Sequence, residues 1–377
     1  MLDAIIIGLG SMGSSSIYEL AKSGIKVLGI EQFGIGHKKG SYSGATRIVR
    51  KAYFEHLDYV PLLKESYKGW NAIQIESGEV LFKKTGLVYY GEKEHPIIEG
   101  VQKAAQIYQI NLLEGNDYVI PQFSMPSNFH TLFESDAGFV FSEKTIKTYS
   151  QIAKSLGAEI HINEKVSGIK QRDGMVTVTT YKNDYKCKKL IVTSGVYYNQ
   201  LFENGGVDLS VTRQLIIWIE PKNVMHFQLG EFPCWMISDP SYEGVFYGFP
   251  IAPTSEYGGN GWLKVAHHLP GERISPNQLN NFNPNDERVK IESILKKYMP
   301  DALGEVKSVS ACMYANTDDG HFVIDYLPGS NQQIIIAGGF SGHGFKFVPV
   351  VGKILRDMIL EGKSSLPIDF LSINRFR

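Results

Sequence analysis

The chain has 377 residues, of which 43% are hydrophobic and 20% charged, and 38 basic and 39 acidic residues give a net charge of -1. This length predicts two domains, since one hydrophobic core usually stops growing at a smaller size. The balanced charge argues against nucleic acid or an anionic membrane as the main partner. Because no apolar run reaches 18 residues, we expect no membrane span.

The three cysteines, Cys187, Cys234 and Cys312, are too sparse for a disulfide framework and predict a reducing compartment. No cysteine or histidine spacing suggests zinc, so we expect no metal. The N-terminus has no basic stretch before its apolar residues and no small-residue cleavage site, which argues against a signal peptide. We therefore expect a cytoplasmic protein.

The N-terminal segment predicts a strand, a helix and a second strand. Residues 4–8 form a short apolar run typical of a buried parallel strand, and residues 25–30 form another that ends at Glu31. Between them, Gly8, Gly10 and Gly13 form a GxGxxG loop that precedes apolar residues at near-helical spacing. This order of elements is typical of a dinucleotide-binding βαβ unit.

Each glycine of this loop has a physical role in dinucleotide binding. One makes the tight turn, one lets the pyrophosphate approach the backbone, and one lets the helix pack closely on the strand. The helix N-terminus stabilises the phosphate charge, and Glu31 can accept hydrogen bonds from a ribose. The motif does not separate NAD from FAD, whereas Glu31 disfavours the extra phosphate of NADP. The alternative is a chance cluster of glycines in a loop.

Strand-like segments that end in glycine recur at residues 189–195 and 334–339. Helices are predicted over 143–156 and 346–361, and residues 164–181 predict two strands joined by an Asp-Gly turn. Strands that end in glycine at the start, middle and end of the chain would assemble one discontinuous nucleotide-binding domain.

We expect that domain to comprise residues 1–80, 143–210 and 312–377. The remaining segments, 81–142 and 211–311, are rich in aromatic residues and short alternating strands. This pattern favours a mixed or antiparallel sheet, which we expect to form a substrate domain.

Motifs along nearly the whole chain resemble those of the monomeric sarcosine oxidase family, which includes N-methyltryptophan oxidase. They are Gly8–Gly13, Gly40-Ser41, Thr46–Arg50, Tyr247–Pro250, Leu263-Lys264, His268, Cys312–Tyr314, His321–Asp325, Gly339–Lys346 and Ser372–Arg375. The Cys-x-Tyr and Gly-Phe-Ser-Gly-His-Gly-Phe-Lys motifs are more specific than the glycine loop. The resemblance implies an α/β fold in which a Rossmann-type FAD-binding domain, like that of glutathione reductase, joins a mixed-sheet substrate domain.

The family resemblance implies that FAD is the cofactor and that a thioether links Cys312 to the flavin 8α-methyl group. It implies FAD contacts by Gly8, Gly10, Ser11, Met12, Gly13, Glu31, Ser41, Arg47, Val166, Gly195, Cys312, Met313, Gly342, His343, Gly344, Phe345 and Lys346. Such a bond needs a thiolate, which nearby positive charge favours. Without the resemblance, a buried structural cysteine is the simpler interpretation. Cys187 and Cys234 match no family site.

The same resemblance implies which residues handle the substrate. Arg50 and Lys346 resemble the pair that binds the substrate carboxylate. Lys264 resembles the lysine that activates oxygen, where a fixed cation stabilises the charge of superoxide. The resemblance also implies that the flavin face is lined by Tyr247, His268 and Tyr314. The residues alone also allow a surface ion pair for Arg50, a solvated Lys346, an outward-facing Lys264 and ordinary core packing for the other three.

The implied activity is the oxidation of secondary amino acids, in particular N-methyl amino acids, by a monomeric enzyme. A hydride from the carbon next to nitrogen would pass to flavin N5, giving an imine, and O2 would be reduced to hydrogen peroxide. The alternatives are a cyclic imino acid, glycine or a glycated amino acid as substrate, and a flavin-binding protein without turnover. An NAD-dependent dehydrogenase would explain neither Cys312 nor the C-terminal glycine motif.

One loop departs from the family pattern. The family often has Gly-Ser-His-His-Gly-Asp-Thr-Arg, whereas this chain has Gly-Ser-Tyr-Ser-Gly-Ala-Thr-Arg over residues 40–47. The change removes two imidazoles and a carboxylate from a loop expected near the flavin and the substrate, and it leaves the identity of the substrate open. The segment after Tyr314 also lacks a proline that family members commonly carry.

Overall fold

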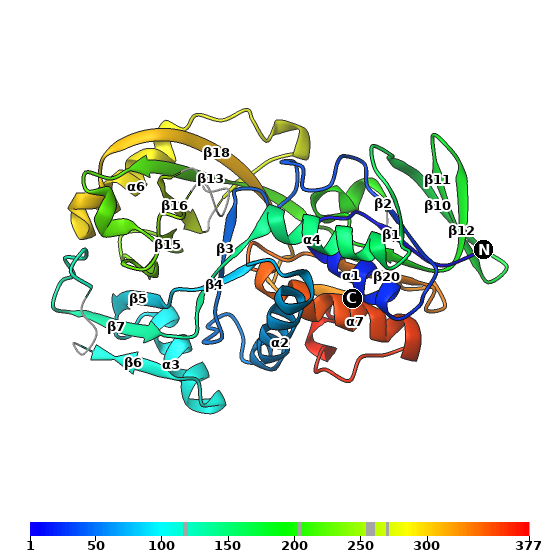
Figure 1. Cartoon of the computed structure of the whole chain (residues 1–377), viewed down its shortest axis with the longest axis horizontal. Helices are drawn as coiled ribbons and strands as arrows, with labels where there is room; N and C mark the ends of the chain where they lie inside the picture. The colour runs from blue at the N-terminus through cyan, green and yellow to red at the C-terminus, as the bar shows by residue number, and fades with distance from the viewer. Residues whose placement is uncertain (116–119, 203–204, 254–260, 269–270, 377) are drawn as a thin grey trace.

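The computed structural model describes residues 1–376 except 116–119, 203–204, 254–260 and 269–270. The strands form an eight-stranded sheet, a nine-stranded sheet and a three-stranded sheet. The eight-stranded sheet lies at the end of the molecule that carries the N-terminus, and the nine-stranded sheet lies at the other end (Figure 1).

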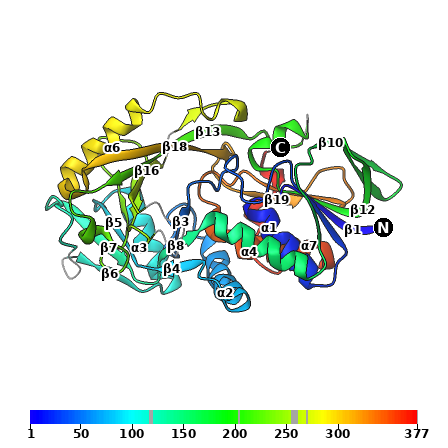
Figure 2. The same ribbon diagram turned by 45° about the horizontal axis from the view of Figure 1, so that its top comes forward.

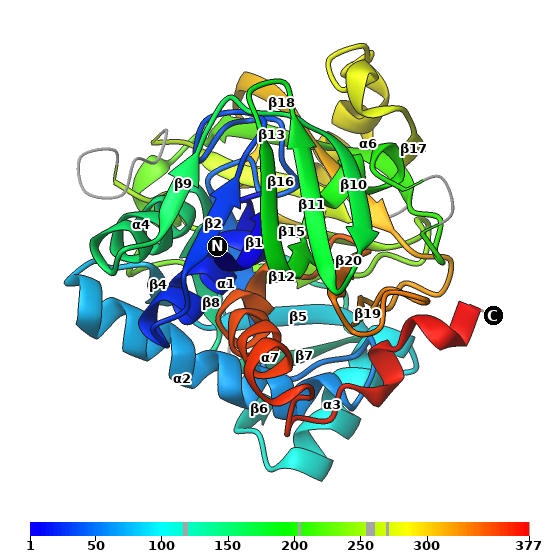
Figure 3. The same ribbon diagram turned by 90° about the vertical axis from the view of Figure 1, so that its right-hand side faces the viewer.

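The eight-stranded sheet has a parallel centre. In spatial order its parallel strands are β9 (Glu159–His161), β2 (Val27–Ile30), β1 (Leu2–Ile7), β12 (Asp184–Val192) and β20 (Ile334–Gly338). Strands β2 and β20 are buried throughout, as their apolar sequences predict. Antiparallel strands β10 (Val166–Arg172), β11 (Met175–Thr180) and β19 (Val323–Tyr326) complete the sheet. Figure 3 shows the β10–β11 hairpin beside β12.

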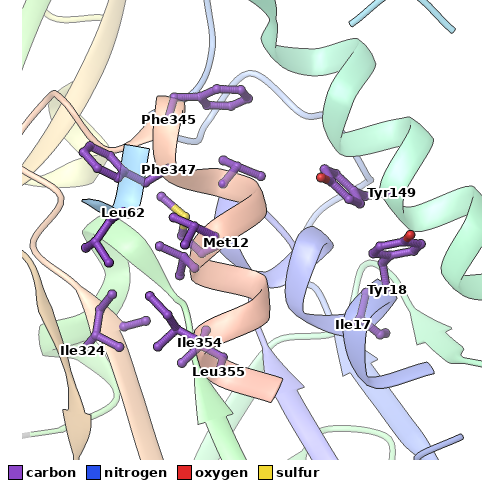
Figure 4. Close-up of a cluster of buried hydrophobic side chains, with 14 of the residues drawn as sticks. Met12, Ile17, Tyr18, Leu62, Tyr149, Ile324, Phe345, Phe347, Ile354 and Leu355 are labelled. Carbon is purple, nitrogen blue, oxygen red and sulfur yellow. The ribbon is translucent and has the colours of Figure 1, made fainter. Parts of the chain in front are cut away.

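Four helices pack together beside this sheet. Helix α1 (Ser11–Lys22) contacts both α4 (Ser142–Ser155) and α7 (Val348–Glu361), and α7 also contacts α2 (Tyr59–Ser77). Figure 4 shows their shared core, in which Met12, Leu62, Tyr149 and Leu355 are buried. The sequence predicted that the last helix begins at residue 346, but residues 345–347 form a 3-10 turn and the α-helix begins at Val348. Pro349 lies in its first turn, where proline favours a helix start.

The nine-stranded sheet is mostly antiparallel. Its spatial order is β17 (Glu272–Arg273), β13 (Ser210–Glu220), β16 (Leu263–His268), β15 (Val245–Phe249), β14 (Cys234–Ile237), β5 (Leu87–Glu92), β7 (Phe129–Glu134) and β6 (Leu112–Glu114), with β18 (Glu305–Asn316) also paired to β13. Strands β14 and β5 are parallel, so the sheet is mixed, as predicted. Helices α3 (Pro96–Tyr108) and α6 (Asn285–Tyr298) lie at the same end of the molecule (Figure 2).

Two long strands and a small sheet join the two ends of the molecule. Strands β13 and β18 pair from Ser210 opposite Asn316 to Glu220 opposite Glu305, and they run across both ends (Figure 1). The small sheet of β3 (Thr46–Val49), β8 (Gly138–Phe141) and β4 (Phe82–Lys84) lies between the large sheets. The domain boundaries expected at 210/211 and 311/312 fall inside these continuous strands, and the division into domains stays a prediction.

Short 3-10 helices occupy several connections. They are η2 (Gly195–Gln200), η3 (Val224–Phe227), η4 (Pro276–Gln278), η5 (Pro300–Ala302), η6 (Phe345–Phe347), η7 (Asp369–Leu371) and η8 (Ile373–Phe376). Among the described helices, none is long and apolar enough to cross a membrane.

Candidate active site

A large cavity opens at the carboxyl ends of the parallel strands. Ile7 ends β1, Ile30 ends β2, and Thr193 follows β12, and all three line the cavity. The cavity holds about 1250 Å³ of empty space, counted to its open mouth. Because open α/β sheets bind ligands at this edge, the cavity lies where the GxGxxG loop predicts a dinucleotide.

The three glycines of the loop allow three different close approaches. Gly8 has a φ of +88°, and a Cβ there would lie 2.7 Å from the Thr193 carbonyl oxygen. At Gly13, a Cβ would overlap the Gly8 carbonyl oxygen, so this glycine lets α1 pack against the strand end. At Gly10 the nearest atom would be a ring carbon of Tyr42 at 3.4 Å, which leaves that backbone accessible from the cavity. A phosphate can therefore approach Gly10 and the N-terminus of α1.

The carboxylate of Glu31 ties the phosphate loop to the end of β2. One oxygen accepts a hydrogen bond of 2.8 Å from the Leu9 amide, and the other accepts one of 2.9 Å from the Phe33 amide. The side chain lines the cavity and is 4% exposed. Because each carboxylate oxygen has two lone pairs, Glu31 can also accept a ribose hydroxyl while it keeps both amides.

Most of the predicted cofactor contacts meet at this cavity. The predicted residues that line it are Gly8, Gly10, Ser11, Met12, Glu31, Ser41, Arg47, Val166, Gly195, Gly342, Gly344 and Phe345. Sequence reasoning missed Tyr42, Glu164, Lys165, Ser194 and Tyr197, which also line it. Their proximity in sequence to Ser41, Val166 and Gly195 was the available signal, since a strand end usually contributes several successive residues.

Five predicted cofactor residues lie outside the cavity lining: Gly13, Cys312, Met313, His343 and Lys346. Gly13 packs against the carbonyl group of Gly8 and so holds the start of α1 close to the glycine loop. Met313 is fully buried among apolar residues of the parallel sheet. Both ring nitrogens of His343 have protein partners, the Tyr53 hydroxyl and the Gly320 carbonyl oxygen. In this structure these five residues are not part of the cavity lining.

Cys312 lies close to the cavity, in the same apolar cluster as the cavity-lining Tyr314. Successive residues of β18 point to opposite faces, so Cys312 and Tyr314 share one face and pack in the same apolar cluster. Tyr314 lines the cavity, and Cys312 is 3% exposed. Burial raises the pKa of the Cys312 thiol, while the charges of Arg47 and Lys264 act to lower it. The cysteine thus has two cations nearby that favour its thiolate.

Arg50 and Lys346 converge on the ring of Tyr53. The Arg50 guanidinium lies 4.4 Å from the ring centroid and the Lys346 ammonium lies 5.1 Å from it. Arg50 is 2% exposed and Lys346 is 6% exposed, which excludes a solvated side chain at either position. Arg50 does form an ion pair, but a buried one: its Nη2 lies 2.7 Å from each carboxylate oxygen of Glu55.

The charges of this group are coupled. Burial opposes ionisation of Glu55, yet Arg50, His343 and Lys346 hold the pKa of its carboxyl at about 2. Burial, together with the charge of Arg50, lowers the pKa of Lys346 to about 7, and Glu55 limits that shift. The ammonium of Lys346 donates to the His343 carbonyl oxygen at 2.7 Å. Two buried cations therefore share one internal carboxylate, and a second anion could join them.

Lys264 is also buried, at 2% exposure, so the outward-facing alternative is wrong. Its ammonium donates to the carbonyl oxygens of Gly44 at 2.7 Å and Thr46 at 2.8 Å, and to the Thr46 hydroxyl at 3.2 Å. Burial and the nearby charge of Arg47 lower the pKa of Lys264. Three acceptors around one nitrogen are nevertheless matched only by the three protons of an ammonium. The lysine is held in one orientation by the loop at residues 44–46.

Aromatic and imidazole groups form a wall beside the cavity. His268 Nδ1 lies 3.1 Å from the Tyr314 hydroxyl, and Tyr247 lies within hydrogen-bonding reach of that same tyrosine. Burial lowers the pKa of His268 to about 4, so its ring is neutral at pH 7. The neighbouring His267 is a structural residue, because it bonds to Glu287 and to the Glu243 carbonyl oxygen.

The loop that departs from the family pattern has an unusual backbone. Ala45 has a φ of 68° and Gly44 a φ of +107°. Their amides donate to one oxygen of Glu143, at 3.2 Å and 3.0 Å, at the start of α4. Arg47 also braces the loop by donating to the carbonyl oxygens of Ser41 and Ser43. These bonds hold the carbonyl groups that orient Lys264.

The cavity fits a bound dinucleotide. It combines an open phosphate loop, the acceptor Glu31 and two buried hydroxyls, those of Tyr42 and Ser194, that have no hydrogen-bond partner in the described structure. Buried polar atoms are rarely left unpaired, so these hydroxyls indicate a polar ligand. No group of three or more histidine, cysteine, aspartate or glutamate residues that could hold a metal occurs among the described residues.

Known proteins resemble the chain over its full length. A family model described as FAD dependent oxidoreductase matches residues 3–358. The monomeric sarcosine oxidase of Bacillus sp. (strain B-0618) is 36% identical over 99% of this chain and 96% of its own. The peroxisomal sarcosine oxidase of Homo sapiens is 32% identical over 99% of this chain and 96% of its own. The N-methyl-L-tryptophan oxidase of Salmonella enteritidis PT4 is 30% identical over 99% of both chains.

Solved structures share the fold. NikD, an unusual amino acid oxidase essential for nikkomycin biosynthesis, superimposes in its open form with a TM-score of 0.85 at 21% identity, covering 98% of this chain and 97% of that one. The L-proline dehydrogenase from P. horikoshii has a TM-score of 0.82 at 20% identity, covering 100% of this chain and 97% of that one. The predicted FAD-binding α/β fold is confirmed. The chain belongs to the monomeric sarcosine oxidase and N-methyl-L-tryptophan oxidase family of FAD-dependent amine oxidases.

Proposed function

We propose that this protein oxidises secondary amino acids, in particular N-methyl amino acids, with O2 as the electron acceptor. The observation that carries the proposal is the convergence of two buried cations, Arg50 and Lys346, on the Tyr53 ring. A buried pair of cations with one internal carboxylate is suited to an anionic substrate group. The relatives named for sarcosine and N-methyltryptophan oxidation support an amino acid as the source of that group.

The substrate carboxylate binds to Arg50 and Lys346. The guanidinium offers a planar fork and the ammonium a point charge, so together they fix both the position and the direction of the carboxylate. Without a substrate, Nη2 of Arg50 donates to both carboxylate oxygens of Glu55. Binding therefore requires Glu55 to share or release this group, because two carboxylates repel each other.

The amine binds in its neutral form beside Tyr247, Tyr314 and His268. A neutral amine keeps the nitrogen lone pair that stabilises the positive charge formed when the adjacent C–H bond breaks. His268 is neutral at pH 7, since burial lowers its pKa to about 4, and it can accept a hydrogen bond without adding positive charge. We assign no side chain as a general base.

Bound FAD supplies the acceptor for the hydrogen and two electrons of that C–H bond and passes the electrons to O2. For an N-methyl amino acid the overall reaction consumes O2 and water and releases formaldehyde, the primary amino acid and hydrogen peroxide. The ammonium of Lys264 is held by three acceptors from residues 44–46. It can stabilise the negative charge that O2 gains with its first electron without reorientation of the surroundings.

Cys312 holds the FAD covalently through a thioether. Its buried position near Arg47 and Lys264, on the same strand face as the cavity-lining Tyr314, supports this assignment. Formation of the bond removes one S–H and one C–H hydrogen, and O2 takes up the two electrons and two protons as hydrogen peroxide. Precipitation of the purified protein with acid tests the link, because a covalent flavin stays in the pellet. A colourless pellet with free FAD in the supernatant would refute it, and Cys312→Ser provides the control.

Peroxide production tests the activity. We expect turnover with sarcosine or N-methyltryptophan, and the assay should include pipecolate, proline, glycine and fructosyl-glycine. Turnover only with pipecolate or proline, glycine or fructosyl-glycine would assign the protein to one of the alternative substrate classes. A protein that contains FAD but produces no peroxide with any of them would be a flavin-binding protein without turnover.

We further infer a monomer in the cytoplasm. The name of the bacterial relative supports the first inference. The three cysteines, all buried and free, support the second, because they match a reducing compartment. Light scattering of the purified holoenzyme would show a mass above 42.1 kDa if the chain assembled with itself. Fractionation of the source cells would test the location.

A further inference from the structure

Tyr42 has a buried hydroxyl with no partner. The residue is 3% exposed and lines the cavity, and its hydroxyl forms no hydrogen bond within the described structure. An unpaired buried polar atom costs free energy, because it has lost its hydrogen bonds to water. The site therefore favours a ligand that offers an acceptor to this hydroxyl.

The ring of Tyr42 lies against the phosphate loop. One of its ring carbons is 3.4 Å from the position of a Cβ at Gly10, and it also contacts Gly40. The His37 ring packs against it, with centroids 5.6 Å apart. These contacts fix the phenol beside Gly10 and the N-terminus of α1, where the diphosphate of a dinucleotide binds.

The chemistry of the phenol matches that position. Burial and the nearby charges of Glu31 and Glu143 raise the pKa of Tyr42, so the hydroxyl keeps its proton and can donate. A diphosphate is ionised at neutral pH and accepts hydrogen bonds, which are stronger when the acceptor is charged. The amide of Leu9 is already bonded to Glu31 and is not available to the ligand.

We propose that the Tyr42 hydroxyl donates a hydrogen bond to the diphosphate of FAD. The residue stands where the family often has histidine, so this contact belongs to the altered loop of this chain. The proposal rests on FAD as the cofactor and does not depend on which amine is oxidised.

The test uses holoenzymes in a Cys312→Ser background, in which FAD is released reversibly. Tyr42→Phe removes only the hydroxyl oxygen and keeps the ring against Gly10. We expect FAD, followed by its fluorescence after dilution, to dissociate about ten- to hundredfold faster, the loss of one hydrogen bond to a charged group. Tyr326→Phe is the matched control, because its hydroxyl bonds to Met358 and Gly362 of the α7 region. It should leave the release rate unchanged.

A second measurement reports on the diphosphate itself. The ³¹P resonances of bound FAD should shift in Tyr42→Phe and stay in place in Tyr326→Phe. An unchanged release rate together with unchanged ³¹P resonances would overturn the proposal. Faster release without a ³¹P shift would also overturn it, because the hydroxyl would then contact another part of FAD. Neither measurement needs turnover, so a failed oxidase assay would leave both results interpretable.

Discussion

Two regions of the site each bury a lysine, and they satisfy it differently. Around Lys264, the loop at residues 44–46 provides three acceptors within 3.2 Å, and all of them belong to the protein. Around Lys346, the one hydrogen-bond acceptor described is the His343 carbonyl oxygen at 2.7 Å. Both side chains are nearly inaccessible, at 2% and 6% exposure. The difference lies in how many ammonium protons remain for a ligand.

We interpret this difference as one between a fixed charge, at Lys264, and a group that can still bind a ligand, at Lys346. An ammonium with three protein acceptors is oriented before any reaction and acts mainly through its electric field. An ammonium with one acceptor, beside Arg50 and Glu55, gains stabilisation when an anion arrives. We therefore expect the Lys264 region to control the reaction with oxygen and the Lys346 region to control the binding of the carboxylate.

The largest effect should come from Lys264→Met. We expect the rate at which O2 oxidises the reduced flavin to fall about 10²- to 10³-fold, since a preorganised charge next to the developing anion is lost. Stopped-flow absorbance measures this rate after anaerobic reduction. Lys346→Met is the control, and its oxygen reaction should stay within about threefold of the parent, because its charge acts on the carboxylate. An equal fall in the oxygen reaction rate of the two variants would contradict these separate roles of Lys264 and Lys346.

Lys346→Met should instead weaken substrate binding. We expect KM for the amino acid to rise about ten- to hundredfold, as for the loss of one hydrogen bond to a charged group, with a smaller change in kcat. Steady-state peroxide release measures both constants. Lys264→Met should leave the dissociation constant of a carboxylate inhibitor unchanged. A KM that stays at the parent value in Lys346→Met would remove this lysine from the carboxylate site.

The pH dependence of anion binding offers a third comparison. Burial and Arg50 lower the pKa of Lys346 to about 7, so its charge is present below that pH and is lost as the pH rises. Butanoate has the shape of sarcosine but no amine, and it stays ionised throughout. Its affinity should fall up to about tenfold between pH 7 and pH 8, the limit for one proton. Flavin absorbance titrations measure this affinity. Lys346→Arg should abolish the change in its pH dependence near pH 7, because arginine stays charged.

Glu55 sharpens the comparison because we expect it to compete with the ligand in the Lys346 region only. Glu55→Gln should tighten butanoate binding about three- to tenfold below pH 7 by removing a like charge from Arg50. It should also move the pH break downward, since Glu55 acts to raise the pKa of Lys346. Glu65→Gln, in α2, pairs with surface lysines and is the matched control. Weaker binding in Glu55→Gln would show that the carboxylate positions Arg50 rather than blocks it.

The sequence predicted the parts of this site whose signals are local. Gly8, Gly10 and Gly13 follow a strand and precede a helix, and this order fixes the phosphate loop. The apolar runs around Ile6 and Ile336 identify strands buried on both faces. These features depend on neighbours in the chain, so their positions follow from spacing alone.

The charge environment of the site could not be predicted in this way. The alternation around Lys264 allows either face. The side chain is buried because its ammonium contacts residues 44–46 and the rings of Trp218 and Phe249. Glu55 follows Arg50 at no helical or strand period, yet the chain folds back so that the two pair. Likewise, the hydroxyl of Tyr42 is unpaired only because of how its loop lies against Gly10. Such contacts arise from tertiary packing, which a single sequence does not encode in its periodicity.

The smallest effect should follow from a change at Tyr53, whose ring contacts both cations. Tyr53→Phe removes the hydrogen bond to His343 but keeps the ring, which lies 4.4 Å from the Arg50 guanidinium and 5.1 Å from the Lys346 ammonium. We expect the dissociation constant of butanoate to rise only about two- to threefold, whereas Tyr53→Leu, which also removes the cation–π attraction, should raise it about tenfold. Titration of both variants at pH 6.5, where Lys346 is mostly charged, compares them directly. Equal effects would mean that the bond to His343, and not the face of the ring, holds the two cations together.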